Sequence, residues 1–112
     1  MRDPSQRLRG VLEAIERIED RISGGRAAFE DDAMLQVWVL HHLQIISEAC
    51  RSLPENFRQQ RAEVDWSRLV GMRHVLVHQD FEIDTDIVWA VVERELPMLK
   101  QKVNEILDRG AD

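Results

Sequence analysis

Residues 30–52 read EDDAMLQVWVLHHLQIISEACRS, and this stretch decides the fold because it forms one long helical pattern. Its apolar stripe consists of Ala33, Met34, Val37, Trp38, Leu40, Ile45 and Ile46. Apolar residues three and four apart share one face of an α-helix, so a helix from about Glu30 to Ser52 is predicted. Asp31 and Asp32 lie in its first turn, where carboxylates favour the positive end of the helix dipole. The width of the stripe predicts that this helix is buried on two sides.

A second amphipathic pattern precedes this helix. It begins at Asp3-Pro4-Ser5, where capping oxygens and a proline suit a helix N-terminus, and it continues to Ile22. Gly24-Gly25 ends it, because glycine adopts the left-handed conformation that closes a helix. On the other side of the long helix, Leu53-Pro54 breaks the pattern, and residues 54–61 are expected to form a short turn of helix.

Two more helical patterns complete the chain. One runs from Asp65 to about His78, and Asp84 is the expected N-cap of the last helix, which continues to Leu107. Pro97 should kink that last helix, since proline removes a backbone donor. No hairpin turn lies between alternating apolar runs, so no strand pair is expected. The sequence therefore predicts an all-α fold, an antiparallel up-and-down bundle of four main helices with a short fifth.

Length and composition limit the class of protein. The chain has 112 residues, the size of one domain, so residues 1–112 are expected to form a single helical domain. Its apolar runs are short and its N-terminus is polar, so we expect a cytoplasmic protein without a membrane span. Cys50 is the one cysteine, which excludes an internal disulfide and a cysteine-built zinc site.

The charge is unevenly distributed along the chain. The formal net charge is −6, which argues against indiscriminate binding to RNA or DNA. Between Arg51 and Arg73, however, five arginines stand against three carboxylates. Recognition of phosphate is therefore expected to be local and based on arginine.

Arg73 and His78 are the residues best suited to chemistry. A guanidinium stabilises charge on phosphorus-bound oxygens and an imidazole moves a proton near neutral pH, so the pair can act on a phosphodiester. On an unbroken helix the two side chains would point roughly 140° apart, at about 100° per residue. A two-fold dimer would solve this by forming a composite site between subunits. Alternatively, Arg73 pairs with a carboxylate such as Asp80, and His78 caps a helix C-terminus.

The other histidines offer weaker alternatives. His74 and His78 are four residues apart, the spacing of two zinc ligands on one helical face, and Asp80 or Glu82 could be a third ligand. Two histidines are weak support for a metal, so no metal site is predicted. The pair His41-His42 is interpreted as a part-buried residue beside an exposed one.

Three segments resemble the HepT-like family when read together. They are Leu43–Ala49, Val64–His78 and Phe81–Trp89, followed by Glu95-Leu-Pro97. HepT-like proteins are HEPN-domain proteins and form the toxin half of bacterial HepT/MntA toxin–antitoxin pairs. The likeness covers the chain from about residue 30 to its end.

The resemblance implies an all-helical homodimer that cleaves RNA without a metal or cofactor and leaves DNA intact. Arg73 and His78 match the family's Arg-x4-His motif and would be catalytic, and the partner would be an MntA-like nucleotidyltransferase antitoxin. His74, which stands where the family has an asparagine, and Asp80 would have supporting roles.

One departure from the family pattern changes how the chain could be regulated. The family's His-x-Tyr is His78-Gln79-Asp80 here, and the chain contains no tyrosine. Silencing by tyrosine adenylylation is therefore chemically impossible on this chain, so inhibition needs direct antitoxin binding or another acceptor. The same departure keeps a second hypothesis open: an inactive HEPN adaptor that binds a nucleotidyltransferase or a nucleotide, with Arg73 as an anion contact.

Overall fold

The computed structural model describes residues 3–110 as a set of helices joined by turns. In chain order the elements are α1 (Pro4–Glu19), α2 (Gly25–Glu30), α3 (Ala33–Arg51), α4 (Glu55–Gln59), α5 (Trp66–Gly71), the 3₁₀ turn η1 (Met72–His74), α6 (Thr85–Ala90), the π-helical turn η2 (Val91–Glu95) and α7 (Leu96–Asp108). Within residues 3–110 no strand forms, which confirms the all-helical class.

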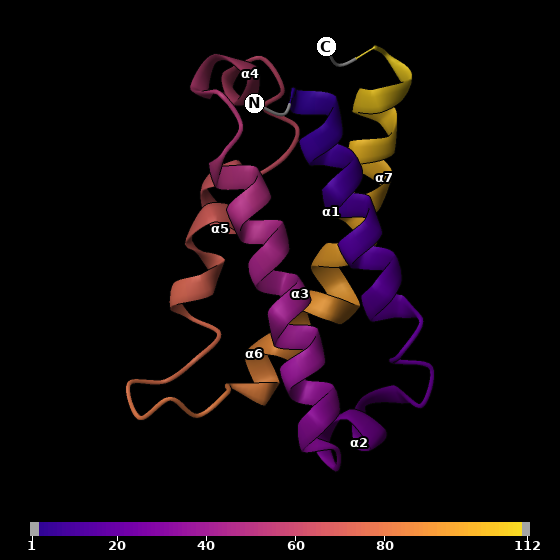
Figure 1. Ribbon diagram of the computed structural model, residues 1–112, viewed down its shortest axis with the longest axis vertical. Helices are drawn as coiled ribbons and strands as arrows, with labels where there is room; N and C mark the ends of the chain where they lie inside the picture. The colour runs from indigo at the N-terminus through magenta and orange to yellow at the C-terminus, as the bar shows by residue number, and fades with distance from the viewer. Residues whose placement is uncertain (1–2, 111–112) are drawn as a thin grey trace.

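The long elements run alternately down and up the molecule. In Figure 1, α1 descends, α3 returns beside it, α5 descends on the other side of α3, and the continuous segment α6–η2–α7 rises behind them. The molecule measures 41 × 29 × 24 Å along its principal axes. Helix α3 thus lies between α1 and α5 and organises the core.

Aspartates set where four of the helices begin. The side chains of Asp3, Asp32, Asp65 and Asp84 each accept a hydrogen bond from the backbone N–H three residues further on, at 2.9 to 3.2 Å. An N-cap of this kind stabilises a helix by about 1 kcal/mol. The starts predicted at Asp65 and Asp84 are confirmed. The long helix begins three residues later than predicted, because Asp32 caps it from outside.

One face of α3 is left uncovered by the other elements within residues 3–110. Its inner face is fully buried and comprises Val39, Leu43, Ile46 and Cys50. On the opposite face Met34 is 79% exposed and Val37 is 54% exposed, and Ile45 is also exposed. The prediction of burial on two sides is confirmed by α1 and α5, which flank α3, but within residues 3–110 no other element packs over this outer stripe.

The predicted helix from Asp65 to His78 is wrong in its second half. The α-helix ends at Gly71, η1 ends at His74, and a small hairpin follows in which Val77 and Ile83 form an isolated antiparallel bridge. The N–H of His78 donates to the carbonyl of Glu82 at 2.8 Å. Glycine and β-branched residues such as Val75 and Val77 are poor helix formers, and here they favour the hairpin.

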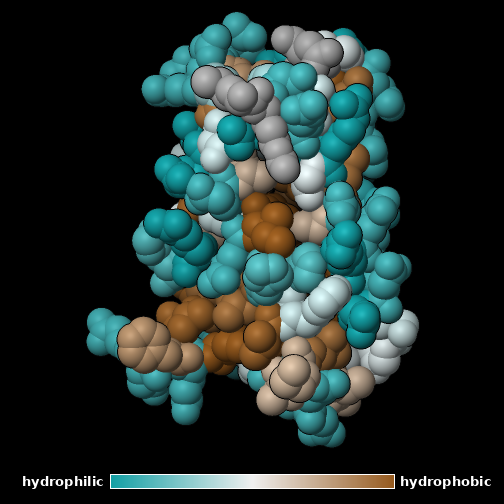
Figure 2. Space-filling model, viewed as in Figure 1, coloured by the Kyte–Doolittle hydropathy of each residue, from teal (hydrophilic) through white to brown (hydrophobic). Residues whose placement is uncertain are grey.

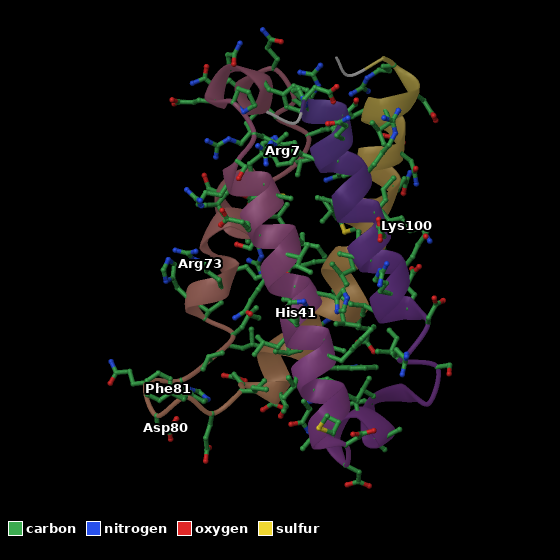
Figure 3. All side chains as sticks on the ribbon, in the orientation of Figure 1. Arg7, His41, Arg73, Asp80, Phe81 and Lys100 are labelled. Atoms are coloured by element: carbon green, nitrogen blue, oxygen red, sulfur yellow. The ribbon has the colours of Figure 1, made fainter. Side chains whose placement is uncertain are left out.

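The hairpin turns through an unusual residue. Phe81 has φ +69°, the left-handed conformation that usually requires glycine, and its N–H donates to the carbonyl of His78 at 2.9 Å. Phe81 is 87% exposed. Phe81 therefore projects from the bundle at the tip of the loop (Figure 3).

Two other boundaries differ from the sequence prediction. Helix α1 ends at Glu19, before Gly24-Gly25, and the glycines lead into the additional short helix α2, where Gly25 has φ +82°. A kink is predicted at Pro97, and the structure has a π-helical turn, η2, which ends two residues before it. A wide turn at this place accommodates a residue that has no backbone donor. The short helix predicted at residues 54–61 is present as α4.

Candidate functional site

Arg73 lies in η1 and reaches toward α3. Its side chain is about half exposed, and its Nη1 lies 3.9 Å from Oε2 of Glu48. The alternative expectation that Arg73 pairs with a carboxylate is therefore confirmed, but the partner is Glu48 of α3 and not Asp80. In Figure 3 the side chain of Arg73 is on the outer edge of the molecule, level with the middle of α3. At 3.9 Å this ion pair is loose, so the guanidinium is free to engage another anion.

Glu48 is shared by several arginines. Arg51, one turn further along α3, donates two hydrogen bonds to it, from Nε at 3.0 Å and from Nη2 at 2.5 Å. These bonds lower the pKa of Glu48, and the charges of Arg51, Arg73 and Arg7 lower it further. Glu48 is therefore an ionised carboxylate in a surrounding that is positive overall.

His78 lies in the stem of the hairpin and is oriented by Asp84. Its Nε2 lies 3.4 Å from Oδ2 of Asp84, whose other oxygen caps α6. The imidazole is 57% exposed, whereas the Asp84 side chain is 19% exposed. The expectation that His78 caps a helix C-terminus is wrong, because the helix has ended before it. With Nε2 directed at a carboxylate, Nδ1 is the atom left to exchange a proton with a substrate.

The residues predicted to support the site are placed differently. His74 is exposed at the end of η1. Asp80 is exposed at the hairpin tip, where its Oδ1 accepts a hydrogen bond from the N–H of Glu82 at 3.2 Å. The hydrogen bonds and ion pairs found within residues 3–110 do not join Asp80 to Arg73 or to His78. Asp80 therefore shapes the turn that follows His78.

The histidine pair in α3 has the expected asymmetry. His41 is exposed, whereas His42 is buried and its Nδ1 lies 2.8 Å from the carbonyl oxygen of Trp38. Across the described part of the chain, no three His, Cys, Asp or Glu side chains are grouped as metal ligands would be. Cys50 is fully buried, and burial raises the pKa of its thiol to about 12, so it is not a nucleophile at neutral pH.

The comparison with known proteins now decides the family. A family model described as "Ribonuclease HepT-like" matches residues 11–106. The chain belongs to the ribonuclease HepT-like family. This confirms the resemblance seen in the sequence.

Two HepT-like relatives cover almost the whole chain. "Putative RNase TTE0752" of Caldanaerobacter subterraneus subsp. tengcongensis is 34% identical over 112 residues, which cover 97% of this chain and 98% of the relative. "Probable ribonuclease HepT" of Thermococcus cleftensis is 33% identical over 102 residues, which cover 88% and 91%. No solved structure matches the chain.

In this HepT-like chain the two motif residues, Arg73 and His78, do not contact each other. Arg73 faces Glu48 of α3, whereas His78 faces Asp84 at the start of α6. No hydrogen bond or ion pair among residues 3–110 joins the two side chains. Both side chains are exposed, and each lies beside a carboxylate, Glu48 for Arg73 and Asp84 for His78. Both are therefore accessible to a ligand.

Sequence reasoning did not identify Glu48 and Asp84 as the carboxylates that contact the two residues of the HepT-like motif. Asp84 was recognised only as an N-cap, although a capping aspartate keeps a second oxygen for another partner. Glu48 stands in the quoted segment three residues before Arg51, a spacing that signals a pair on one helix face. Nothing in the sequence indicates that Arg73 would approach that pair, because the approach depends on how η1 packs beside α3.

Among residues 3–110, no helix has the length and apolar character needed to cross a membrane.

Proposed function

We propose that this HepT-like chain is a metal-independent endoribonuclease, the toxin of a toxin–antitoxin pair, whose active site forms between two copies of the chain. The observation that carries the proposal is that Arg73 and His78 are both exposed and that a neighbouring carboxylate faces each of them. Arg73 contacts α3, whose outer face carries exposed apolar residues. Family membership supports the ribonuclease class.

The chemistry follows from the two side chains. His78 takes the proton from a ribose 2′-hydroxyl, and the 2′-oxygen attacks the adjacent phosphorus. The bond to the 5′-oxygen breaks, and this leaving oxygen takes up the proton that His78 removed, directly or through water, which gives a 2′,3′-cyclic phosphate and a 5′-hydroxyl. Arg73 stabilises the charge that develops on the phosphorus-bound oxygens. DNA lacks the 2′-hydroxyl and is not cleaved.

The outer face of α3 supports the homodimer. Met34, Val37 and Ile45 form an exposed stripe along it. Figure 2 shows apolar side chains gathered over the lower half of this face, between α3 and the hairpin loop. A second copy related by a two-fold axis would bury this stripe and set two Arg73–His78 pairs along one groove.

A nucleotidyltransferase antitoxin is the partner we propose, and it would act by binding, because the chain has no tyrosine to modify. A second exposed apolar surface is available for it. An apolar hollow of about 410 Å³ lies between η1 and α6–η2, lined by Met72, Val75, Ile87 and Val91 among others. The same hollow favours the second candidate function, a non-catalytic adaptor that only binds such a partner.

Two inactive variants test the shared site. We expect the wild-type protein to cleave single-stranded RNA in EDTA and to leave DNA of the same sequence intact, whereas Arg73→Ala and His78→Ala homodimers are inactive. A purified heterodimer of the two variants should recover about half of the wild-type rate, because one of its two composite sites is complete.

The outcomes separate the competing arrangements. A heterodimer as inactive as both homodimers would show that each site lies within one chain. An intact wild-type dimer that cleaves no RNA but co-purifies with an adjacent nucleotidyltransferase would favour the adaptor.

Asp84 is expected to act as a positioning residue for His78, and asparagine provides a clean test. Asn caps a helix as well as Asp does, so Asp84→Asn should keep α6 and the melting temperature. It removes the charge that orients the imidazole, and kcat should fall about 100-fold with KM little changed. The pH profile of kcat should shift as well. A loss of activity that accompanies a lower melting temperature, or an unchanged pH profile, would assign Asp84 only to the fold.

A further inference from the structure

Two guanidinium groups contact Glu48, and a third lines the same hollow as Glu48. Arg51 comes from α3 itself, Arg73 comes from η1 on one side of α3, and Arg7 comes from α1 on the other side. Figure 3 shows Arg7 and Arg73 flanking the C-terminal half of α3. Three positive charges face one carboxylate, so this strip of surface is positive in a chain whose formal net charge is −6.

A hollow accompanies the arginines on the α1 side. It has a volume of about 410 Å³, and Arg7, His41, Gln44, Glu48 and Ser52 contribute polar groups to its wall. Arg7 and Glu48 therefore line the same hollow, whose edge Arg73 approaches through its contact with Glu48. Ile45 of the outer stripe also lines the hollow, so the hollow borders the proposed dimer interface.

We propose that Arg7 forms a subsite for a backbone phosphate of single-stranded RNA next to the phosphate held by Arg73. The proposal rests on the ribonuclease function proposed above and adds a second contact to the same strand. Glu48 occupies the subsite when no RNA is bound and competes with phosphate for the arginines.

The relative strengths of the contacts favour replacement of Glu48 by an RNA phosphate as the partner of Arg7 and Arg73. Glu48 and its arginine partners are exposed, and exposed ion pairs contribute little to stability. A phosphate diester offers two oxygens to a planar guanidinium, which binds phosphate in a bidentate fork. Arg51 can retain Glu48 on its own helix, so Arg7 and Arg73 can turn to the substrate without leaving the carboxylate unpaired.

Binding of an RNA strand that cannot be cleaved tests the subsite. The probe is a fluorescent single strand with 2′-O-methyl groups, and Kd is measured by polarisation from low to moderate salt. Arg7→Ala should weaken binding about tenfold, the effect of one charge-assisted contact, and should make the log–log salt slope shallower by about 0.7. A DNA strand of the same sequence should show the same loss, because the subsite contacts phosphate alone.

Two further variants make the result specific. Arg9 is an exposed arginine of the same helix, and it does not line the hollow. Arg9→Ala should therefore leave Kd unchanged. Glu48→Gln removes the competing carboxylate and should tighten binding about threefold, the opposite direction to a general loss of structure. All three variants should keep the wild-type circular dichroism spectrum.

These measurements can contradict the phosphate subsite and the ribonuclease activity independently of each other. Equal Kd values for Arg7→Ala and Arg9→Ala, or weaker binding by Glu48→Gln, would overturn the subsite even if the wild-type protein cleaves RNA. Binding that depends on Arg7 in a protein that never cleaves RNA would keep the subsite and overturn the ribonuclease.

Discussion

Replacing His78 with alanine is expected to slow RNA cleavage about 10³-fold, because a general base or acid in this role contributes 10²- to 10⁴-fold. The hairpin should survive the change, since His78 takes part in it through its backbone N–H and carbonyl. The measurement is kcat on a fluorescent RNA in EDTA, together with growth of cells that express the variant. Those cells should grow normally, whereas wild-type expression should arrest growth.

Gln79→Ala is the matched control for this variant. Gln79 is the exposed neighbour of His78 in the same hairpin and has no partner assigned in the proposed chemistry. It should keep the wild-type rate within about twofold. Cleavage that persists in His78→Ala would remove this imidazole from the reaction.

An aspartate at Val37 is expected to separate the dimer and abolish cleavage. Val37 is 54% exposed on the outer stripe of α3, so the isolated chain should fold with the substitution. In a two-fold interface the change would bury two unpaired carboxylates, each at a cost of several kcal/mol. Light scattering should show a monomer, and the rate of RNA cleavage should fall at least about 100-fold, since a composite site needs both subunits.

Met98→Asp controls for adding a charge to an exposed apolar position. Met98 is 57% exposed on α7 and lies against α5, away from α3. The variant should remain a dimer and cleave RNA at the wild-type rate. If Val37→Asp stayed dimeric and active, the α3 stripe would not be the dimer interface.

The helices were largely predictable because their signals are local. Asp65 and Asp84 begin helices through hydrogen bonds to residues three positions away, and these pairs can be read directly from the chain. The end of α5 was less predictable. Leu69, Met72 and Leu76 keep a helical spacing and are all buried. Leu76, however, lies in the hairpin and not in a helix. Apolar spacing shows which residues are buried, but not which backbone conformation buries them.

The chemistry of the site was only partly predictable for a similar reason. The types and order of Arg73 and His78 single them out in the sequence and match the HepT-like family. Their acidic partners could not be inferred, because the break after Gly71 redirects both side chains. The short hairpin turns His78 toward Asp84, and the 3₁₀ turn sets Arg73 beside α3.

The amino-acid sequence by itself determined the helical class, the N-caps and the pair of residues suited to RNA chemistry, because each depends on side chains within one or two turns of each other. Only the tertiary structure decided that Glu48 and Arg7 share a surface with Arg73, and that one face of α3 stays uncovered. These features depend on which helices pack side by side, and contacts between residues far apart in the chain leave no periodic pattern in it.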